Sequence, residues 1–200
     1  MDVLRYTINR LIAVKTYRFE KSISVILNGI LYSFGFAIFT ALMAKIRFYT
    51  PFTPVPFTGQ VFAVLLSGLI LGKVFGPLSQ ILYIGIGLSG INWFAIGPFS
   101  LTGGYIVGFF VASFLIGLIT EDTENQNIFI TALSMAAGLA VIYTLGLIQF
   151  CIYTGNQLSN GLKLAVLPFI PFDLLKAFIA VVIGRLVLKK VRNRVKAIIT

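Results

Sequence analysis

Histidine is absent from this 200-residue chain, and cysteine occurs once, at Cys151. The lack of histidine excludes histidine metal sites, histidine proton relays and nucleophile–histidine pairs. A single cysteine excludes intrachain disulfides and cysteine-based metal clusters. The chain has six acidic residues against 16 basic ones, and no two of the acidic residues lie in the same apolar stretch. We therefore expect no metal, no cofactor and no acid–base pair of the kind that a hydrolase needs.

A phosphate-binding loop for nucleotides is also missing. The fragment nearest to G-x-x-x-x-G-K-[ST] is Gly72-Lys73-Val74, which lacks both the spacing and the hydroxyl residue. The chain is therefore not expected to hydrolyse ATP, and we expect it not to be an enzyme.

Charged residues are scarce, at 11% of the chain, whereas hydrophobic residues make up 58%. With a mean hydropathy of +0.97, the chain is expected to be an all-α membrane protein. The second and third of its six apolar stretches are short, and residues 72–76 between them are typical of a tight turn joining antiparallel helices. The alternative, one long span, would bury Lys73 in lipid. The six stretches lie at about 23–44, 58–72, 75–90, 98–119, 127–152 and 165–188.

Basic residues gather at both ends of the chain. If both ends are cytoplasmic, Lys73 lies with them, and Lys45, Arg47 and Lys163 are the basic residues left on the outer side. This distribution satisfies the positive-inside rule for six transmembrane helices, so we predict both termini to be cytoplasmic. The net charge of +10 then requires no nucleic acid as a partner.

Three regions follow from this topology. Residues 1–22 form a basic arm whose apolar residues are spaced for an amphipathic helix lying on the inner membrane surface. Residues 23–188 form the transmembrane domain, which we expect to bind a substrate. Residues 189–200 form a basic cytoplasmic tail.

Asp173 is an acidic residue inside an apolar stretch, and Lys176 follows it on the same helical face. An ionisable residue at membrane depth costs roughly 2.5–3.5 kcal/mol, which makes this pair a candidate functional site. Pro171 suits the first turn of a helix, so Asp173 would lie near the outer leaflet, where the helix dipole favours an anion. The alternative is an ion pair that only fixes helix packing.

Two outward-facing segments supply further candidates. Residues 45–57 contain closely spaced prolines, which favour an extended conformation. Residues 89–97 form a glycine-punctuated bend. Together with the charged pair, polar and aromatic residues of these segments and of the helices that follow would form a small-molecule pocket. Alternatively, residues 45–57 only connect two spans, and Trp93 only anchors the chain at the level of the lipid headgroups. The candidates are Phe52, Gln60, Asn92, Trp93 and Tyr105.

Small residues four positions apart let helices approach closely. Ala37 and Ala41 form such a pair in the first span, where an external partner and internal packing are both open. Gly104 and Gly108 form another pair in the fourth span, where we expect internal packing.

Several motifs in order resemble the BioY family, the biotin-specific substrate-binding subunits (S components) of energy-coupling factor (ECF) transporters. The resemblance covers residues 23–188 and rests on P-F-T-P-V-P-F-T-G-Q, L-L-S-G-L-I-L-G, G-P-L-S-Q, Y-I-G-I-G, N-W-F-A, G-G-Y-I-V-G-F and D-L-L-K-A. It implies a six-helix protein in a prokaryotic cell membrane that captures biotin at its outer face. It also implies a transmembrane coupling subunit and two cytoplasmic ATPase subunits as partners.

The resemblance assigns roles to particular residues. It implies that Asn92, Asp173 and Lys176 make the polar contacts to biotin, and that Ala37 and Ala41 dock on the coupling subunit. Two rival functions remain: an ion-gradient-driven secondary transporter of a small organic anion, and an intramembrane enzyme acting on lipid. The first would favour a midplane site within an inverted repeat, and the second needs more acid–base residues than the spans contain.

Overall fold

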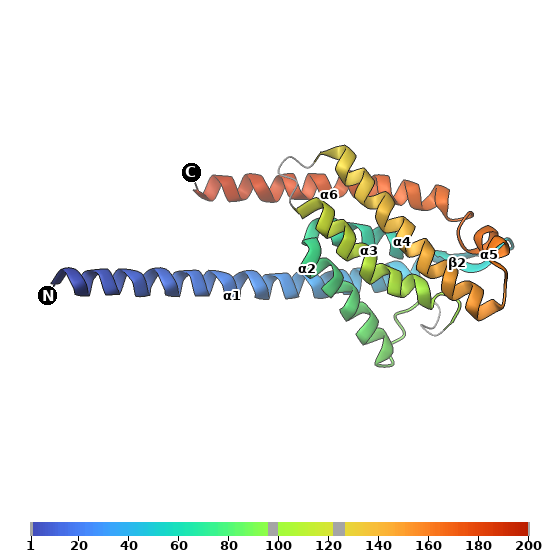
Figure 1. The fold of residues 1–200 in the computed structure, drawn as a ribbon, viewed down its shortest axis with the longest axis horizontal. Coiled ribbons are helices and arrows are strands. Elements are labelled where there is room, and N and C mark those ends of the chain that lie inside the picture. The colour runs from blue at the N-terminus through green and yellow to red at the C-terminus, as the bar shows by residue number, and fades with distance from the viewer. Residues whose placement is uncertain (1, 96–99, 122–126, 200) are drawn as a thin grey trace.

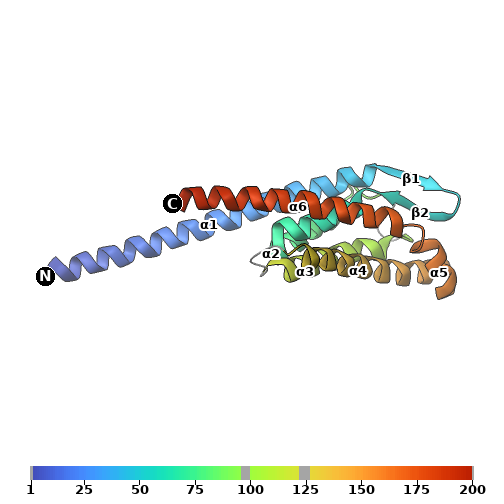
Figure 2. The same ribbon diagram turned by 90° about the horizontal axis from the view of Figure 1, so that it is seen from above.

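The computed structural model describes the backbone of residues 2–95, 100–121 and 127–199 and the side chains of residues 23–95, 100–120 and 127–188. Within these ranges the elements are α1 (Asp2–Lys45), β1 (Arg47–Thr50), β2 (Thr53–Thr58), α2 (Gln60–Leu88), α3 (Gly103–Glu121), α4 (Ile128–Thr154), α5 (Leu158–Ala165) and α6 (Ile170–Ile199). The helices pack side by side, and α1 and α6 both extend beyond one end of the bundle (Figure 1). The strands and α5 lie at the opposite end (Figure 2).

Helix α2 folds back on itself at Gly72, which has φ 73° and ψ −171°. Glycine adopts this conformation readily because it has no Cβ. Nε2 of Gln60 lies 2.8 Å from the hydroxyl of Tyr83, 23 residues further on, whereas a straight helix of that length would span about 34 Å. The two halves of α2 are therefore antiparallel arms, as the sequence predicts, and the single long span is wrong.

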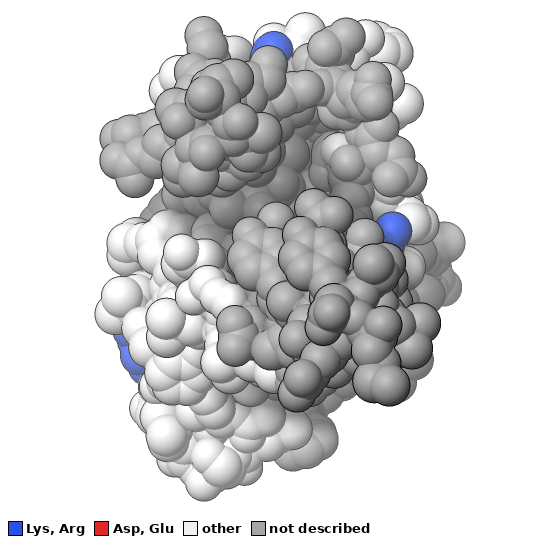
Figure 3. Space-filling model, turned by 90° about the vertical axis from the view of Figure 1, so that its left-hand side faces the viewer, with Lys and Arg blue, Asp and Glu red and all other residues white. Residues whose placement is uncertain are grey.

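The hairpin in α2 affects the number of segments that can cross the membrane. Among the residues that the structure describes, four helices are long and apolar enough to cross a bilayer, namely α1 from Ile23, α2, α3 and α4. The pair α5–α6, bent by 53°, adds another. Because α2 contributes two arms, these elements account for all six apolar stretches. The free ends of α1 and α6 lie on the same side of the bundle in both ribbon views. The end face on that side shows a few basic side chains and no acidic one among its described residues (Figure 3).

Gly72→Ala is expected to lower the free energy of unfolding by about 1–3 kcal/mol, because a side chain at this φ is strained. Helix α3 also packs closely against this turn, since a Cβ at Gly117 would lie 2.3 Å from the carbonyl carbon of Gly72. Thermal unfolding in detergent measures the effect. Gly35→Ala is the matched control, because nothing lies within 4 Å of a Cβ at that helical position. Equal losses in the two variants would contradict the assignment of Gly72 as the turn.

Two features go beyond the sequence-based expectation. The proline-rich segment is extended, as predicted, and it forms a two-stranded antiparallel sheet in which Phe48 pairs with Phe57. The other described elements are helices, which confirms the predicted helical fold class. The arm, described from residue 2, continues into the first span as part of α1, and its placement on the membrane surface stays a prediction. Residues 2–28 contain neither glycine nor proline, so nothing in the sequence interrupts the helix.

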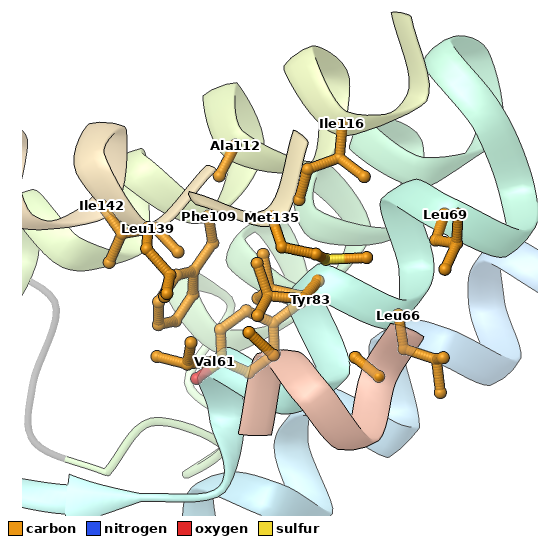
Figure 4. Close-up of a cluster of buried hydrophobic side chains, with 14 of the residues drawn as sticks. Val61, Leu66, Leu69, Tyr83, Phe109, Ala112, Ile116, Met135, Leu139 and Ile142 are labelled. Atoms are coloured by element: carbon orange, nitrogen blue, oxygen red, sulfur yellow. The ribbon is translucent and has the colours of Figure 1, made fainter. Parts of the chain in front are cut away.

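The core lies where α2, α3 and α4 meet and is built from aliphatic and aromatic side chains around the buried ring of Tyr83 (Figure 4). Bare glycines let the helices approach. A Cβ at Gly104 would lie 2.1 Å from the carbonyl oxygen of Leu145, and one at Gly108 would lie 2.9 Å from Cα of Ile142. The predicted internal packing of this glycine pair is therefore confirmed.

Ala37 and Ala41 also lie inside the bundle. Their exposed fractions are 0% and 6%, and both belong to the buried core cluster. Neighbouring Ile38 and Leu42 are exposed instead, at 38% and 58%. Their burial favours internal packing, and the docking role that the resemblance implies stays a prediction.

Candidate functional site

A pocket of about 540 Å³, counted with its open mouth, has residues of β2 in its wall and therefore lies at the end of the bundle that carries the strands. Its walls come from β2, the start of both α2 and α6, and the facing parts of α3 and α4. Most of its surface is apolar, and a few polar groups converge on it, which is the usual composition of a small-molecule site. It is lined by Val55, Pro56, Thr58, Gln60, Val61, Ala95, Thr102, Tyr105, Ile106, Phe109, Ile142, Tyr143, Phe169, Asp173 and Lys176.

The charged pair forms the polar side of this pocket. Asp173 lies in the first turn of α6 and is 2% exposed. Its Oδ1 accepts a hydrogen bond from Nζ of Lys176 at 2.7 Å. The same ammonium donates to the backbone carbonyl of Thr58 at 2.8 Å. Lys176 therefore joins the start of α6 to the end of β2, and the pair is part of the pocket wall as well as an ion pair.

Tyr143 completes the carboxylate's surroundings. Its hydroxyl, on α4, donates to Oδ2 of Asp173 at 2.8 Å. A carboxylate has about four acceptor positions, so Asp173 keeps capacity for N–H donors of a ligand. Sequence reasoning missed Tyr143. A hydroxyl inside an apolar span was the available signal, but it does not reveal toward which helix the side chain points.

An aromatic cluster fixes the strands against α6. The ring of Phe57 on β2 lies 4.9 Å from Phe48, 4.4 Å from Phe169 and 5.2 Å from Phe172, measured between centroids. The partner strand is held in turn by backbone pairing. Offset and edge-to-face ring contacts of this kind add about 0.5–1.5 kcal/mol each beyond area burial. This cluster keeps the Thr58 carbonyl within reach of Lys176.

Tyr105 and Gln60, both predicted from the sequence, line the pocket. The hydroxyl of Tyr105 donates to the backbone carbonyl of Ala165 at the end of α5. Its ring fills the place of a side chain at Gly146, where a Cβ would lie 2.4 Å from the ring. The amide of Gln60 is held by Tyr83.

Three other predicted residues do not line the pocket. Phe52 lies in the turn between the strands and is 70% exposed. The side chain of Asn92 is exposed, and its backbone carbonyl accepts a hydrogen bond from Lys45. Trp93 is half-buried and packs against the core. Neighbouring Ala95 reaches the pocket instead.

Several known proteins resemble this chain. The BioY family matches residues 15–193. A protein of Thermotoga maritima named biotin transporter BioY is 38% identical over 157 residues, which cover 74% of this chain and 89% of that protein. A probable biotin transporter BioY of Pyrococcus horikoshii is 39% identical over 140 residues, or 66% of this chain and 79% of that protein.

The fold has a solved counterpart. A crystal structure described as the S-component for biotin from an ECF-type ABC transporter aligns with a TM-score of 0.77 and 25% identity. The alignment covers 83% of this chain and 93% of the other. The family match spans most of the chain and includes every described element of the pocket, so the chain belongs to the BioY family.

Proposed function

We propose that this chain binds biotin in the pocket around Asp173 and Lys176, as the substrate-binding S component of an ECF-type ABC importer. The observation that carries the proposal is a buried carboxylate paired with a lysine in an otherwise apolar pocket. Membership of the BioY family and the likeness to a solved biotin S-component support it. The chain is a multi-pass protein of the cell membrane and a binding subunit, not an enzyme.

The chemistry of biotin suits these groups. Its ureido ring offers two N–H donors and a carbonyl, its bicycle is apolar apart from a thioether, and its valerate ends in a carboxylate. The free acceptor positions of Asp173 fit the ureido N–H groups. Lys176 supplies a hydrogen-bond donor for the remaining oxygens. The rings of Tyr105 and Phe169 cover the bicycle.

The topology proposed from the sequence puts the pocket at the extracellular face and both termini in the cytoplasm. The basic residues of both terminal segments support this orientation. The free ends of α1 and α6 also lie on the same side of the bundle, as this orientation requires. Transport would require a transmembrane coupling subunit and two cytoplasmic ATPase subunits. The site for the coupling subunit is not assigned to Ala37 and Ala41, which are buried.

A secondary transporter would place its substrate near the bilayer midplane, between repeats. Here β2, the first residues of α2 and the first turns of α6 form one part of the pocket wall, and the facing parts of α3 and α4 form the other, at the end of the bundle that carries the strands. This position favours capture at a membrane face.

Purified alone, the chain is expected to bind biotin, to show no ATPase activity and to give no concentrative uptake into vesicles. Isothermal titration measures binding, and a vesicle assay with imposed proton or sodium gradients measures uptake. Desthiobiotin, which keeps the ureido ring, should bind, whereas a ligand lacking that ring should bind far more weakly because buried polar groups would be left unpaired. Gradient-driven accumulation by this polypeptide alone would overturn the proposal in favour of a secondary transporter.

A further inference from the structure

Gln60 and Tyr83 join the pocket to the interior of the α2 hairpin. Gln60 is the first residue of α2, lines the pocket and is 5% exposed. Tyr83 lies on the other arm, is fully buried and does not line the pocket. Nε2 of Gln60 donates to the Tyr83 hydroxyl at 2.8 Å. Tyr83, which lies outside the pocket, therefore holds the side chain of Gln60, which lines it.

In the structure the nitrogen end of the amide is the end that meets Tyr83. With Nε2 engaged by Tyr83, Oε1 of Gln60 makes no hydrogen bond within the described part of the chain, and it is not sealed from the pocket. An amide has a donor end and an acceptor end, which exchange places when it turns by half a rotation. Holding the donor end inside leaves the acceptor end to the pocket.

Tyr83 is itself held by the segment before α3. Its ring meets Phe94 edge-on at a centroid distance of 5.3 Å, and Phe94 lies over Gly87, where a Cβ would be 2.3 Å from the ring. The same segment is tied to the start of β1, because Arg47 donates to the carbonyl of Ala95. The rings of Phe94 and Tyr83 therefore connect residues 91–95 to the amide of Gln60.

We infer that Tyr83 is a positioning residue for ligand recognition, which acts by presenting the Gln60 carbonyl oxygen to an N–H donor of the ligand. The inference rests on the proposed function, since biotin's ureido N–H groups are the donors concerned. It adds a second acceptor beside Asp173 and extends the recognition site to residues that the ligand does not contact.

A double-mutant cycle tests this. Tyr83→Phe removes only the hydroxyl and should weaken biotin binding about threefold to tenfold. In a Gln60→Leu background the same change should have no further effect on binding, because the amide it positions is gone. Isothermal titration on the four proteins gives the coupling, and thermal unfolding of each reports stability separately. Tyr32→Phe is the matched control, because that tyrosine is 59% exposed on α1 and should leave binding unchanged.

Equal losses from Tyr83→Phe in both backgrounds would overturn the inference and make Tyr83 a packing residue only. Phe94→Leu is a second test, because it loosens the contact between the rings of Phe94 and Tyr83. It should weaken biotin binding in the protein that keeps Gln60 and should not weaken it further in the Gln60→Leu variant. Failure of the unmutated chain to bind biotin would instead refute the proposed function. The two failures are therefore distinguishable.

Discussion

Asp173→Ala and Lys176→Ala should each weaken biotin binding by about 1.5 kcal/mol or more, which is roughly tenfold or greater. Asp173→Ala removes the acceptor for both Tyr143 and Lys176. Lys176→Ala leaves a carboxylate that is 2% exposed without its counter-ion, so thermal stability should fall as well. Isothermal titration and thermal unfolding in detergent measure the two effects.

Two further variants sharpen this test. Asp173→Asn keeps the size of the side chain, so any loss that it shares with Asp173→Ala comes from the lost charge and acceptor oxygen of the carboxylate and not from packing. Lys163→Ala is the control, because this exposed lysine of α5 does not line the pocket. If Asp173→Ala and Lys176→Ala both left the affinity for biotin unchanged, the biotin site could not be the pocket around this pair.

Ala37→Trp should lower the free energy of unfolding by about 1–3 kcal/mol or more, because an indole must be forced into the buried core. Biotin binding capacity should fall with the folded fraction. Ile38→Trp is the matched control on the same turn of α1, since this residue is 38% exposed and its new side chain can lie in lipid. Thermal unfolding and the yield of binding-competent protein compare the two.

The opposite result would restore the role predicted from the sequence. If Ala37→Trp left stability and biotin affinity unchanged but abolished co-purification with the coupling and ATPase subunits, Ala37 would be a docking residue after all. Pull-down of those subunits therefore belongs in the same experiment.

The parts of the fold that depend on local chemistry could be predicted. Glycine at position 72 is needed for the turn in α2, and Pro171 lies in the first turn of the helix that carries Asp173. The i,i+3 spacing alone predicts that Asp173 and Lys176 can pair, and they do. Each of these features is decided within a few residues of the chain.

What depends on contacts between distant segments could not be predicted. Tyr143 meets Asp173 only because of the rotation of α4 about its axis, and the register of β1 against β2 is set by pairing across a turn. Small residues such as Ala37 fit an internal and an external interface equally well, so spacing does not choose between them. The exposed side chain of Asn92 likewise follows from the path of its loop, which the neighbouring motif does not fix.

The hydrogen bond from Lys176 to the carbonyl of Thr58 has a consequence for how such sites are found. Its acceptor belongs to the main chain, so any residue at position 58 supplies it equally well. Contacts of Lys45, Arg47 and Tyr105 with main-chain carbonyls share this property. Replacing the acceptor residue demands no matching change in the donor. We therefore expect methods that detect contacts from correlated substitutions to miss the links that hold this pocket together, even with many sequences.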